Sequence, residues 1–231
     1  LPKGINKVAV ATASSHNARD VSEKYNFKHA FGDGKDVINH KDVNTVFITT
    51  RHNTHTKFVL DSLKKRKHIF VEKPLCMNED ELNQIMNLYS SSEQYLMVGY
   101  NRRFSPHIKK IIEIFGKESK KAINYRINVG PVDPKHWTQD KDIGGGRIIG
   151  EVCHFLDLCM FLSGSKPKSI TGLSLDDPLN LDDTISSIVQ FENGSVATIS
   201  YYTNGNKMVE KEYLEIYCNG SIGIINDFKK L

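Results

Sequence analysis

The stretch His68-Ile-Phe-Val-Glu-Lys-Pro-Leu75 decides the fold of the first part of the chain. Residues 69–71 form a short apolar run with β-branched members, which predicts a buried strand. Glu72 and Lys73 follow at once, and Pro74 prevents the strand from continuing as a central one. In an open α/β sheet, ligands bind at the carboxyl ends of the strands. The stretch therefore predicts two opposite charges at a ligand-binding edge, and the alternative is a solvated ion pair at a strand end.

The sequence around this stretch alternates between strand and helix patterns. Strands are predicted at residues 7–13, 45–49, 69–71 and 96–100, and helices at residues 18–25, 54–65 and 79–89. Asn17 and Asn78 are the predicted N-caps of the first and third helices, and Glu81 completes a capping-box-like pair with Asn78. Such alternation implies parallel pairing with right-handed crossovers. Residues 1–101 are therefore predicted to form a Rossmann-like parallel sheet.

One part of a dinucleotide-binding fold is not found in the sequence. That fold begins with a strand, a G-x-G-x-x-G turn and a helix whose N-terminus receives the pyrophosphate. The segment Gly32-Asp-Gly34 has the first two glycines, but no strand is predicted before it and Val37 stands where the third glycine belongs. We interpret it as a surface loop. We expect a truncated sheet that lacks its first βα unit.

The pattern changes in residues 102–231. A helix is predicted from Pro106 to about Phe115, and a long apolar helix at residues 148–162. Alternating runs flank Asn-Gly at residues 193–194 and 219–220, which is the strongest short-range signal for a hairpin. This part is therefore predicted to be an α+β domain with a large, mostly antiparallel sheet and one helix lying across it.

Composition narrows the classes of partner. Charged residues make up 25% of the 231 residues and the apolar class 39%, which is ordinary for a globular protein. The net charge is +4 and the only dense basic cluster is residues 64–67, so no nucleic-acid partner is expected. The four cysteines form no C-x-x-C pair and no segment reads as a membrane span. We therefore expect reduced thiols, a cytoplasmic location, no membrane partner and no metal.

The predicted helix at residues 148–162 carries polar side chains that could do chemistry. At roughly 100° per residue, Gly150, His154 and Asp157 lie on one stripe, and Glu151 is about 60° from His154. A histidine among apolar residues is often a satisfied core residue, but an imidazole also accepts protons near neutral pH. The triglycine at residues 144–146 lets backbone approach a ligand closely, and the alternative is a flexible hinge.

Three motifs together resemble the Gfo/Idh/MocA (glucose–fructose oxidoreductase / inositol dehydrogenase) family over nearly the whole chain. They are E-K-P at residues 72–74, V-G-Y-N-R-R-F at residues 98–104, and G-G-G-R-I-I-G-E-V-C-H-F-L-D at residues 144–157. The last run is most similar to members fused to a zinc-type alcohol dehydrogenase domain. The resemblance implies an NAD(P)-dependent oxidoreductase that acts on a hydroxyl of a sugar, nucleotide sugar or cyclitol. It also implies a homo-oligomer formed through the sheet of the second domain.

The resemblance also implies roles for individual residues. Lys73 is the implied catalytic residue at the substrate hydroxyl, and His154 is the implied proton-transfer residue. The two are expected to face one cleft shared by the domains. The implied contacts to NAD or NADP include Thr50, His52, His55, Glu72, Lys73 and Asn101. The implied substrate contacts are Arg103, Trp137, Arg147, Glu151 and His154.

Two further cofactor contacts are predicted from the residues after the first strand. Ser14 stands where an acid would bind a ribose 2′-hydroxyl, and Arg19 lies one helical turn further on. A hydroxyl and a guanidinium can hold a 2′-phosphate, which favours NADP. The alternative is that Arg19 is a solvated helix residue.

Two positions depart from the family pattern. Gly150 stands where the family has an acid, with Glu151 and Asp157 as candidate replacements, and Arg51-His52 stands where the family has proline and asparagine. Two other functions therefore stay open. One is an inactive sugar-binding or assembly domain, favoured by Gly150 and by the missing glycine turn. The other is an NAD-dependent, glycosidase-like reaction.

Overall fold

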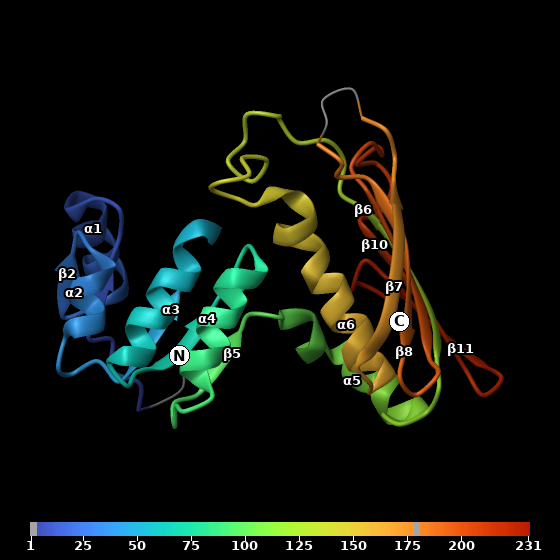
Figure 1. Cartoon of the computed structure of the whole chain (residues 1–231), viewed down its shortest axis with the longest axis horizontal. Helices are drawn as coiled ribbons and strands as arrows, with labels where there is room; N and C mark the ends of the chain where they lie inside the picture. Colours follow the sequence, from blue (N-terminus) through green and yellow to red (C-terminus); the bar gives the residue numbers. More distant parts are fainter. Residues whose placement is uncertain (1–3, 178–180) are drawn as a thin grey trace. The chain divides into compact units, whose positions relative to one another are not determined.

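The computed structural model describes residues 4–177 and 181–231 of the chain. It divides into two compact units, Leu1–Gly99 and Tyr100–Leu231 (Figure 1). Each unit has a hydrophobic core of its own. The units are described in turn.

The first unit is a succession of short parallel strands and helices. Its elements are β1 (Ala9–Ala11), α1 (Ser15–Tyr25), β2 (His29–Phe31), α2 (Gly34–Asn39), β3 (Thr45–Ile48), the 3-10 turn His52–Thr54, α3 (His55–Lys64), β4 (His68–Val71), α4 (Glu79–Tyr89) and β5 (Leu96–Val98). All strand pairs are parallel, which confirms the Rossmann-like prediction. The strands form two sheets, β1-β2 and β3-β4-β5, rather than one continuous sheet, because β1 and β3 do not pair.

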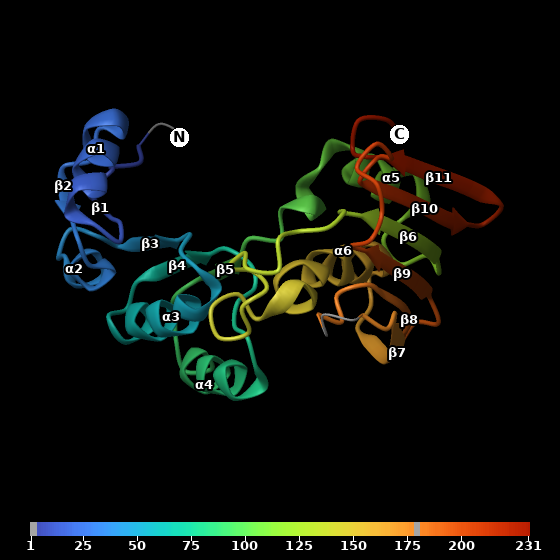
Figure 2. The ribbon, with the colours of Figure 1, turned by 90° about the horizontal axis from the view of Figure 1, so that it is seen from above.

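Helices α3 and α4 pack on the strands β3 and β4 in this unit (Figure 2). Val59 of α3, Ile85 of α4 and Val71 of β4 are fully buried in the same hydrophobic core. Helix α4 begins as predicted, since the backbone N–H of Glu81 donates to Asn78 Oδ1 at 2.9 Å. The apolar residues of β4 are therefore held in place from the helix side.

Two predictions for this unit were wrong. The segment Gly32-Asp-Gly34 does follow a strand, β2, and Asp33 caps α2 by accepting from the Lys35 backbone N–H at 2.9 Å. The strand was missed because the three residues His29–Phe31 are too few to show a period. Ser14, not Asn17, caps α1: its Oγ accepts from the Asn17 N–H at 3.3 Å, so the helix begins at Ser15.

The second unit is a six-stranded sheet with the order β11-β10-β6-β9-β8-β7. Its elements are the 3-10 turn Asn101–Phe104, α5 (Pro106–Phe115), β6 (Ala122–Asn128), a π-helical turn Ile148–Val152, α6 (Cys153–Ser163), β7 (Pro167–Ser174), β8 (Ile185–Phe191), β9 (Val196–Tyr202), β10 (Glu212–Cys218) and β11 (Ser221–Asn226). Only β6 and β9 pair in parallel, which confirms a mostly antiparallel sheet. Both Asn-Gly hairpins form, with Asn219 at φ 48° and Gly220 at φ 76°.

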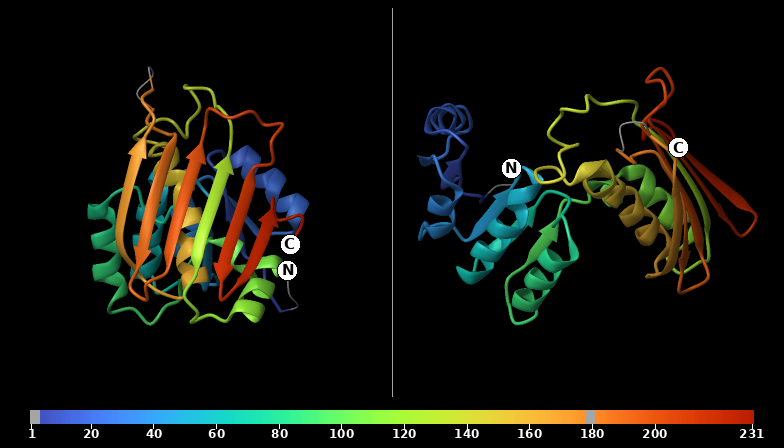
Figure 3. Two further views of the ribbon diagram at one scale, coloured as in Figure 1. Left: turned by 90° about the vertical axis from the view of Figure 1, so that its right-hand side faces the viewer. Right: turned by 45° about the horizontal axis from the view of Figure 1, so that its top comes forward.

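Two helices, α5 and α6, cover one face of this sheet (Figure 1 and Figure 3), whereas we predicted one. Tyr125 and Tyr201 point into the core together with Phe155 of α6. No helix formed by the described residues covers the opposite face of the sheet. Several large apolar side chains are exposed on that face. They include Leu173, Ile188, Ile222 and Ile224.

The predicted single helix at residues 148–162 is two segments. The π-helical turn Ile148–Val152 is followed by α6 from Cys153. A π-helix has more residues per turn than an α-helix. The rotation of 100° per residue, on which the predicted angles of Gly150 and Glu151 relative to His154 depend, therefore does not apply to residues 148–152.

Within the described part of the chain, no helix combines the length and the apolar character that crossing a membrane requires. The same residues contain no group of three or more His, Cys, Asp or Glu side chains that could hold a metal ion. The four cysteines are free thiols.

Candidate functional site

The first group of predicted site residues emerges from the carboxyl ends of β3, β4 and β5. In the sheet register Ile48 lies beside Val71, and Val71 lies beside Val98. The pairing continues past the strands, because the Glu72 N–H donates to the Ile48 carbonyl at 2.9 Å and the Gly99 N–H donates to the Val71 carbonyl at 2.8 Å. Polar residues after the three strands therefore meet at one edge, which is the ligand-binding edge of an open α/β sheet.

The backbone of Gly99 packs directly against the Glu72 carboxylate. A Cβ at position 99 would lie 2.9 Å from Glu72 Oε2 and 3.2 Å from Oε1. Such distances are closer than carbon and oxygen tolerate without a shift. Glycine at position 99 thus leaves room for the present orientation of the Glu72 side chain.

The His55 side chain bridges the chain segments that follow β3 and β4. It is 0% exposed, and its Nδ1 lies 2.7 Å from the Pro74 carbonyl oxygen while its Nε2 lies 3.0 Å from the Thr50 carbonyl oxygen. Both ring nitrogens are thereby occupied by backbone, so the ring is not presented to a ligand. His52 is also buried, with its ring centroid 5.8 Å from that of His55.

The other predicted cofactor contacts lie on the surface. Thr50 and Asn101 are exposed, and Glu72 and Lys73 are half-buried. Arg19 is exposed on α1, while the Ser14 Oγ is used as the cap of that helix. Each is open to solvent to a degree that permits ligand contact.

The residues present fit one end of a dinucleotide. Thr50, Glu72 and Lys73 supply a hydroxyl, a carboxylate and an ammonium at the carboxyl edge, which is a donor set for ribose hydroxyls and a nicotinamide. The 231 residues contain no G-x-G-x-x-G turn to cradle a pyrophosphate.

The second group of predicted residues lies in the second unit, around the start of α6. His154 is buried, with 9% of its surface exposed, and the ring of Tyr100 meets it edge-on at 6.0 Å between centroids. Arg103 Nε donates to Asp157 Oδ2 at 2.6 Å, and the Arg103 guanidinium lies 5.5 Å from the centre of the Phe161 ring. Asp157, a candidate for the missing acid, thus neutralises Arg103.

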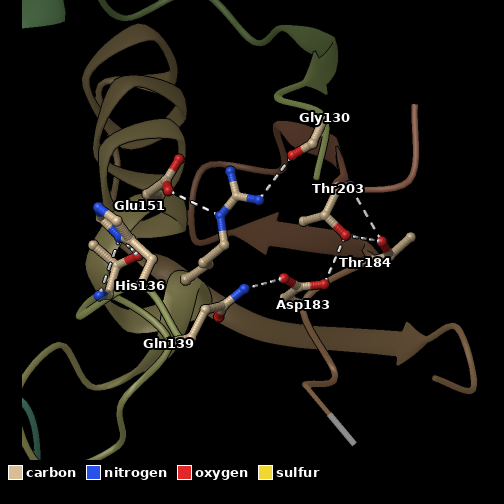
Figure 4. A network of polar contacts seen from close by, with 9 residues as sticks. Gly130, His136, Gln139, Glu151, Asp183, Thr184 and Thr203 are labelled. Carbon is tan, nitrogen blue, oxygen red and sulfur yellow. Dashed lines mark hydrogen bonds and ion pairs between the residues drawn. The ribbon is translucent and has the colours of Figure 1, made fainter. Parts of the chain in front are cut away.

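Arg147 and Glu151 are also paired with each other (Figure 4). Arg147 is 3% exposed; its Nε donates to Glu151 Oε1 at 3.0 Å and its Nη1 donates to the Gly130 carbonyl at 2.9 Å. Burial by itself raises the pKa of Glu151, but the hydrogen bond and charge of Arg147 outweigh it, so the pKa lies below the ordinary value. Burial and then the Glu151 charge raise the pKa of Tyr201, which lies under the Arg147 guanidinium.

A buried aspartate, which the sequence analysis missed, anchors the loop between β6 and the π-helical turn. Asp183 accepts from Gln139 Nε2 at 3.1 Å and from Thr203 Oγ1 at 2.6 Å (Figure 4). Gln139 is two residues from Trp137, the only tryptophan. No motif marks Asp183, because its partners are distant in sequence. The loop that carries Trp137 is therefore tied to the sheet.

Comparison with known proteins identifies the family. Residues 2–100 match the oxidoreductase family with an NAD-binding Rossmann fold, and residues 114–222 match the GFO/IDH/MocA C-terminal domain. The chain belongs to the Gfo/Idh/MocA family of oxidoreductases.

Individual relatives are distant. The chain is 24% identical to trans-1,2-dihydrobenzene-1,2-diol dehydrogenase of Xenopus laevis, over 84% of this chain and 59% of the relative. It is 24% identical to myo-inositol 2-dehydrogenase of Thermotoga maritima, over 83% of this chain and 59% of the relative. A solved structure of levoglucosan dehydrogenase with NADH and levoglucosan superposes with a TM-score of 0.87 at 21% identity, over 97% of this chain and 65% of that chain. The chain thus spans about six tenths of the length of these proteins.

Proposed function

We propose that this chain belongs to an NAD(P)-dependent oxidoreductase that interconverts a hydroxyl and a carbonyl on a sugar, nucleotide sugar or cyclitol. The observation that carries the proposal is the position of Glu72 and Lys73 at the carboxyl edge of β4, with Gly99 packed on the Glu72 carboxylate. Membership of the family supports it. So do the names of the relatives, which act on ring compounds that bear hydroxyl groups.

In this proposal, side chains of this protein stabilise the negative charge on the substrate oxygen and accept the hydroxyl proton. The nicotinamide, when bound, accepts or returns the hydride. Lys73 stabilises negative charge on the substrate oxygen as the C–H bond breaks and the C=O bond forms. The imidazole of His154 takes the hydroxyl proton. Glu72 would hold the ribose that carries the nicotinamide.

The other predicted site residues are proposed to contact either the cofactor or the substrate. Asn101, His52 and Thr50 belong to the cofactor side, and Trp137 belongs to the substrate side. Arg103 is paired with Asp157, and Arg147 is paired with Glu151. Direct contact of Arg103, Arg147 or Glu151 with the substrate requires that the side chain bind the substrate and its ion-pair partner at the same time.

We further propose that the enzyme is a homo-oligomer, held together by the uncovered face of the six-stranded sheet. The exposed apolar residues Leu173, Ile188, Ile222 and Ile224 support this, because monomeric proteins rarely expose large apolar patches. Light scattering on the Ile188→Asp and Ile222→Asp variants tests it: the oligomer should dissociate, and an unchanged mass contradicts the proposal.

Two further proposals concern the location of the protein in the cell and its fusion to another domain. A cytoplasmic location is supported by four free thiols. Fusion to a zinc-type alcohol dehydrogenase domain is tested by reading the gene on both sides of this segment. Either result leaves the proposed chemistry unchanged.

The test of the chemistry is Lys73→Met in the full-length protein. Loss of one charge donor at a reacting oxygen should cost roughly 2.7–4 kcal/mol, or about 10²–10³-fold in kcat. His154→Ala should cost less, because water can accept the proton in its place. Lys57→Met, at an exposed position of α3, is the matched control. Normal turnover by Lys73→Met would overturn the proposed function.

A second candidate is a domain that binds the sugar without turnover. It is favoured by Gly150, where the family has an acid, and by the commitment of both candidate replacement acids to arginines. Sugar binding by the wild-type protein without any hydride transfer to NAD or NADP would establish it.

A further inference from the structure

A pocket of about 600 Å³ lies on the uncovered face of the six-stranded sheet, at the end where β6, β7 and β9 terminate (Figure 3). Arg126 and Tyr202, which line it, alternate along β6 and β9 with the buried residues Tyr125 and Tyr201. Their side chains therefore point away from the core. A volume of this size is typical of a site for a small organic molecule.

Arg126 is the only charged residue among those that line the pocket. Its Nη1 donates to the Glu210 carbonyl at 2.6 Å, while the Glu210 carboxylate is paired with Lys229 at 3.1 Å. Within the described part of the chain no carboxylate forms an ion pair with Arg126, whereas Arg147 is paired with Glu151. A guanidinium carries five N–H donors. Arg126 therefore offers an uncompensated positive charge and further donors to an anion.

Three hydroxyl groups lie beside this guanidinium on the same face of the sheet. In the strand register Arg126 is opposite Ser200, and Ser200 is opposite Ser186, with the Ser186 Oγ donating to the Ser200 Oγ at 3.5 Å. Hydrogen bonds from Ser200 and then from Ser186 lower the pKa of the Tyr202 hydroxyl against the opposing effect of burial, and the charge of Arg126 lowers it further. This end of the face thus stabilises negative charge on an oxygen atom.

The rest of the pocket includes exposed apolar side chains. Leu173, Leu175 and Val209 line it and are 81%, 53% and 56% exposed. The segment that carries Val209 is held in place by Asn128, whose Nδ2 donates to the carbonyls of Asn206 and Val209 at 2.8 Å and 3.2 Å. A ligand with an apolar body would remove this apolar surface from water, which is favourable.

We propose that this pocket binds a small organic carboxylate with an apolar body. The carboxylate pairs with the Arg126 guanidinium, whose planar fork matches the two carboxylate oxygens. The body of the ligand packs against Leu175 and Val209. Binding here does not depend on the proposed oxidoreductase chemistry, because no residue of the pocket is a proposed cofactor or substrate contact.

Titration of the 231-residue chain with octanoate, followed by amide chemical shifts in ¹H–¹⁵N NMR spectra, tests the proposal. Saturable shifts are expected at Ser186, Tyr202 and Val209. Octanamide has the same apolar body without the charge, and acetate has the charge without the body. Each should bind about tenfold more weakly than octanoate, or weaker still. Equal affinities for octanoate and octanamide would overturn the proposal.

The Arg126→Met variant removes the charge and keeps an apolar stem of similar length. Its affinity for octanoate should fall about tenfold or more, and its affinity for octanamide should change little. Lys168→Met, at an exposed position of β7 outside the pocket, is the matched control. Native affinity for octanoate in Arg126→Met would overturn the proposal. Should this variant not fold, the comparison of octanoate with octanamide on the wild-type protein decides.

The proposed oligomer is a second variable, because Leu173 lines the pocket and also belongs to the uncovered apolar face. The titration is therefore repeated on Ile222→Asp, whose substitution lies on β11 and outside the pocket. Saturable octanoate binding by either protein at the three named amides supports the site. Its absence from both proteins would overturn the proposal, and neither result depends on turnover by Lys73.

Discussion

Arg102 and Glu212 are 110 residues apart in the sequence and form a two-point ion pair. Arg102 Nε donates to Glu212 Oε2 at 2.9 Å and Nη2 donates to Oε1 at 2.5 Å. The Tyr125 hydroxyl donates to the same carboxylate, and the Arg102 guanidinium lies 4.8 Å from the centre of the Phe155 ring. Burial and then the Glu212 charge raise the pKa of Tyr125 well above its ordinary value, so the phenol stays a donor. The pair links the turn after Tyr100 to β10.

Glu212→Gln is expected to destabilise the second unit by about 3–5 kcal/mol, because it leaves a buried guanidinium without its counter-charge. The side chains of Arg102 and Glu212 are 16% and 8% exposed, so little water can compensate. Urea unfolding followed by circular dichroism measures the change. Glu113→Gln is the matched control, since its partner Lys110 and Glu113 itself are 53% and 68% exposed. Equal stability of the two variants would contradict the expectation.

The Arg147–Glu151 pair predicts a pH dependence of stability. The folded pKa of Glu151 lies below the ordinary value of 4.5, so the pair stabilises the fold above about pH 4.5 and the contribution is lost as pH falls through the folded pKa. Glu151→Gln should therefore lower Tm at pH 7, and the difference from wild type should shrink towards pH 3. Thermal melts across this range measure it. A difference that is constant with pH would show that the carboxylate charge plays no part.

The anchor at Asp183 predicts a measurable loosening of the Trp137 loop. Asp183→Ala removes the carboxylate that accepts from Gln139 and Thr203, and of these two only Thr203 has a second hydroxyl partner, Thr184, in Figure 4, so the change should cost about 1–3 kcal/mol. Trp137 is the only tryptophan, so acrylamide quenching of its fluorescence reports the loop alone and should increase. Asp36→Ala, at an exposed position of α2, serves as the control. Unchanged quenching would mean that the loop is held by other contacts.

The packing of Gly99 on Glu72 predicts a variant that affects the cofactor more than the fold. Gly99→Ala forces the Glu72 carboxylate away from its place, because the new Cβ would lie 2.9 Å from Oε2. In the full-length protein the affinity for NADH should fall about tenfold, or 1.4 kcal/mol, while Tm changes little. Calorimetric titration and thermal melts measure the two effects. Native affinity for NADH would remove Glu72 from the proposed cofactor site.

Cofactor choice provides the last test. If Ser14 and Arg19 hold a 2′-phosphate, Arg19→Ala in the full-length protein should weaken NADPH binding by about tenfold and NADH binding much less. Titrations with both cofactors measure the ratio. Lys24→Ala, on the same helix, controls for a general loss of positive charge. Equal affinities for NADH and NADPH that Arg19→Ala leaves unchanged would refute the preference for NADP.

Local patterns in the sequence determined several strands and turns of this protein, together with the edge at which its chemistry is expected. Asn219-Gly220 permits positive φ and encodes its hairpin. Asn78 caps α4 through a group three residues away, and the apolar run before Glu72 makes β4. Each of these depends on neighbours along the chain. The family motifs are equally local, which is why they could be read without coordinates.

Only the tertiary structure decided which distant groups meet. The pairing of Arg102 with Glu212, the anchor at Asp183 and the position of His55 between two strand ends all join residues that no local pattern connects. The strand His29–Phe31 exists through its pairing with β1, because three residues show no period. The π-helical turn before His154 likewise escaped a reading based on 3.6 residues per turn. Buried polar groups select partners by the free energy of satisfying them, and the folded chain alone places those partners within reach.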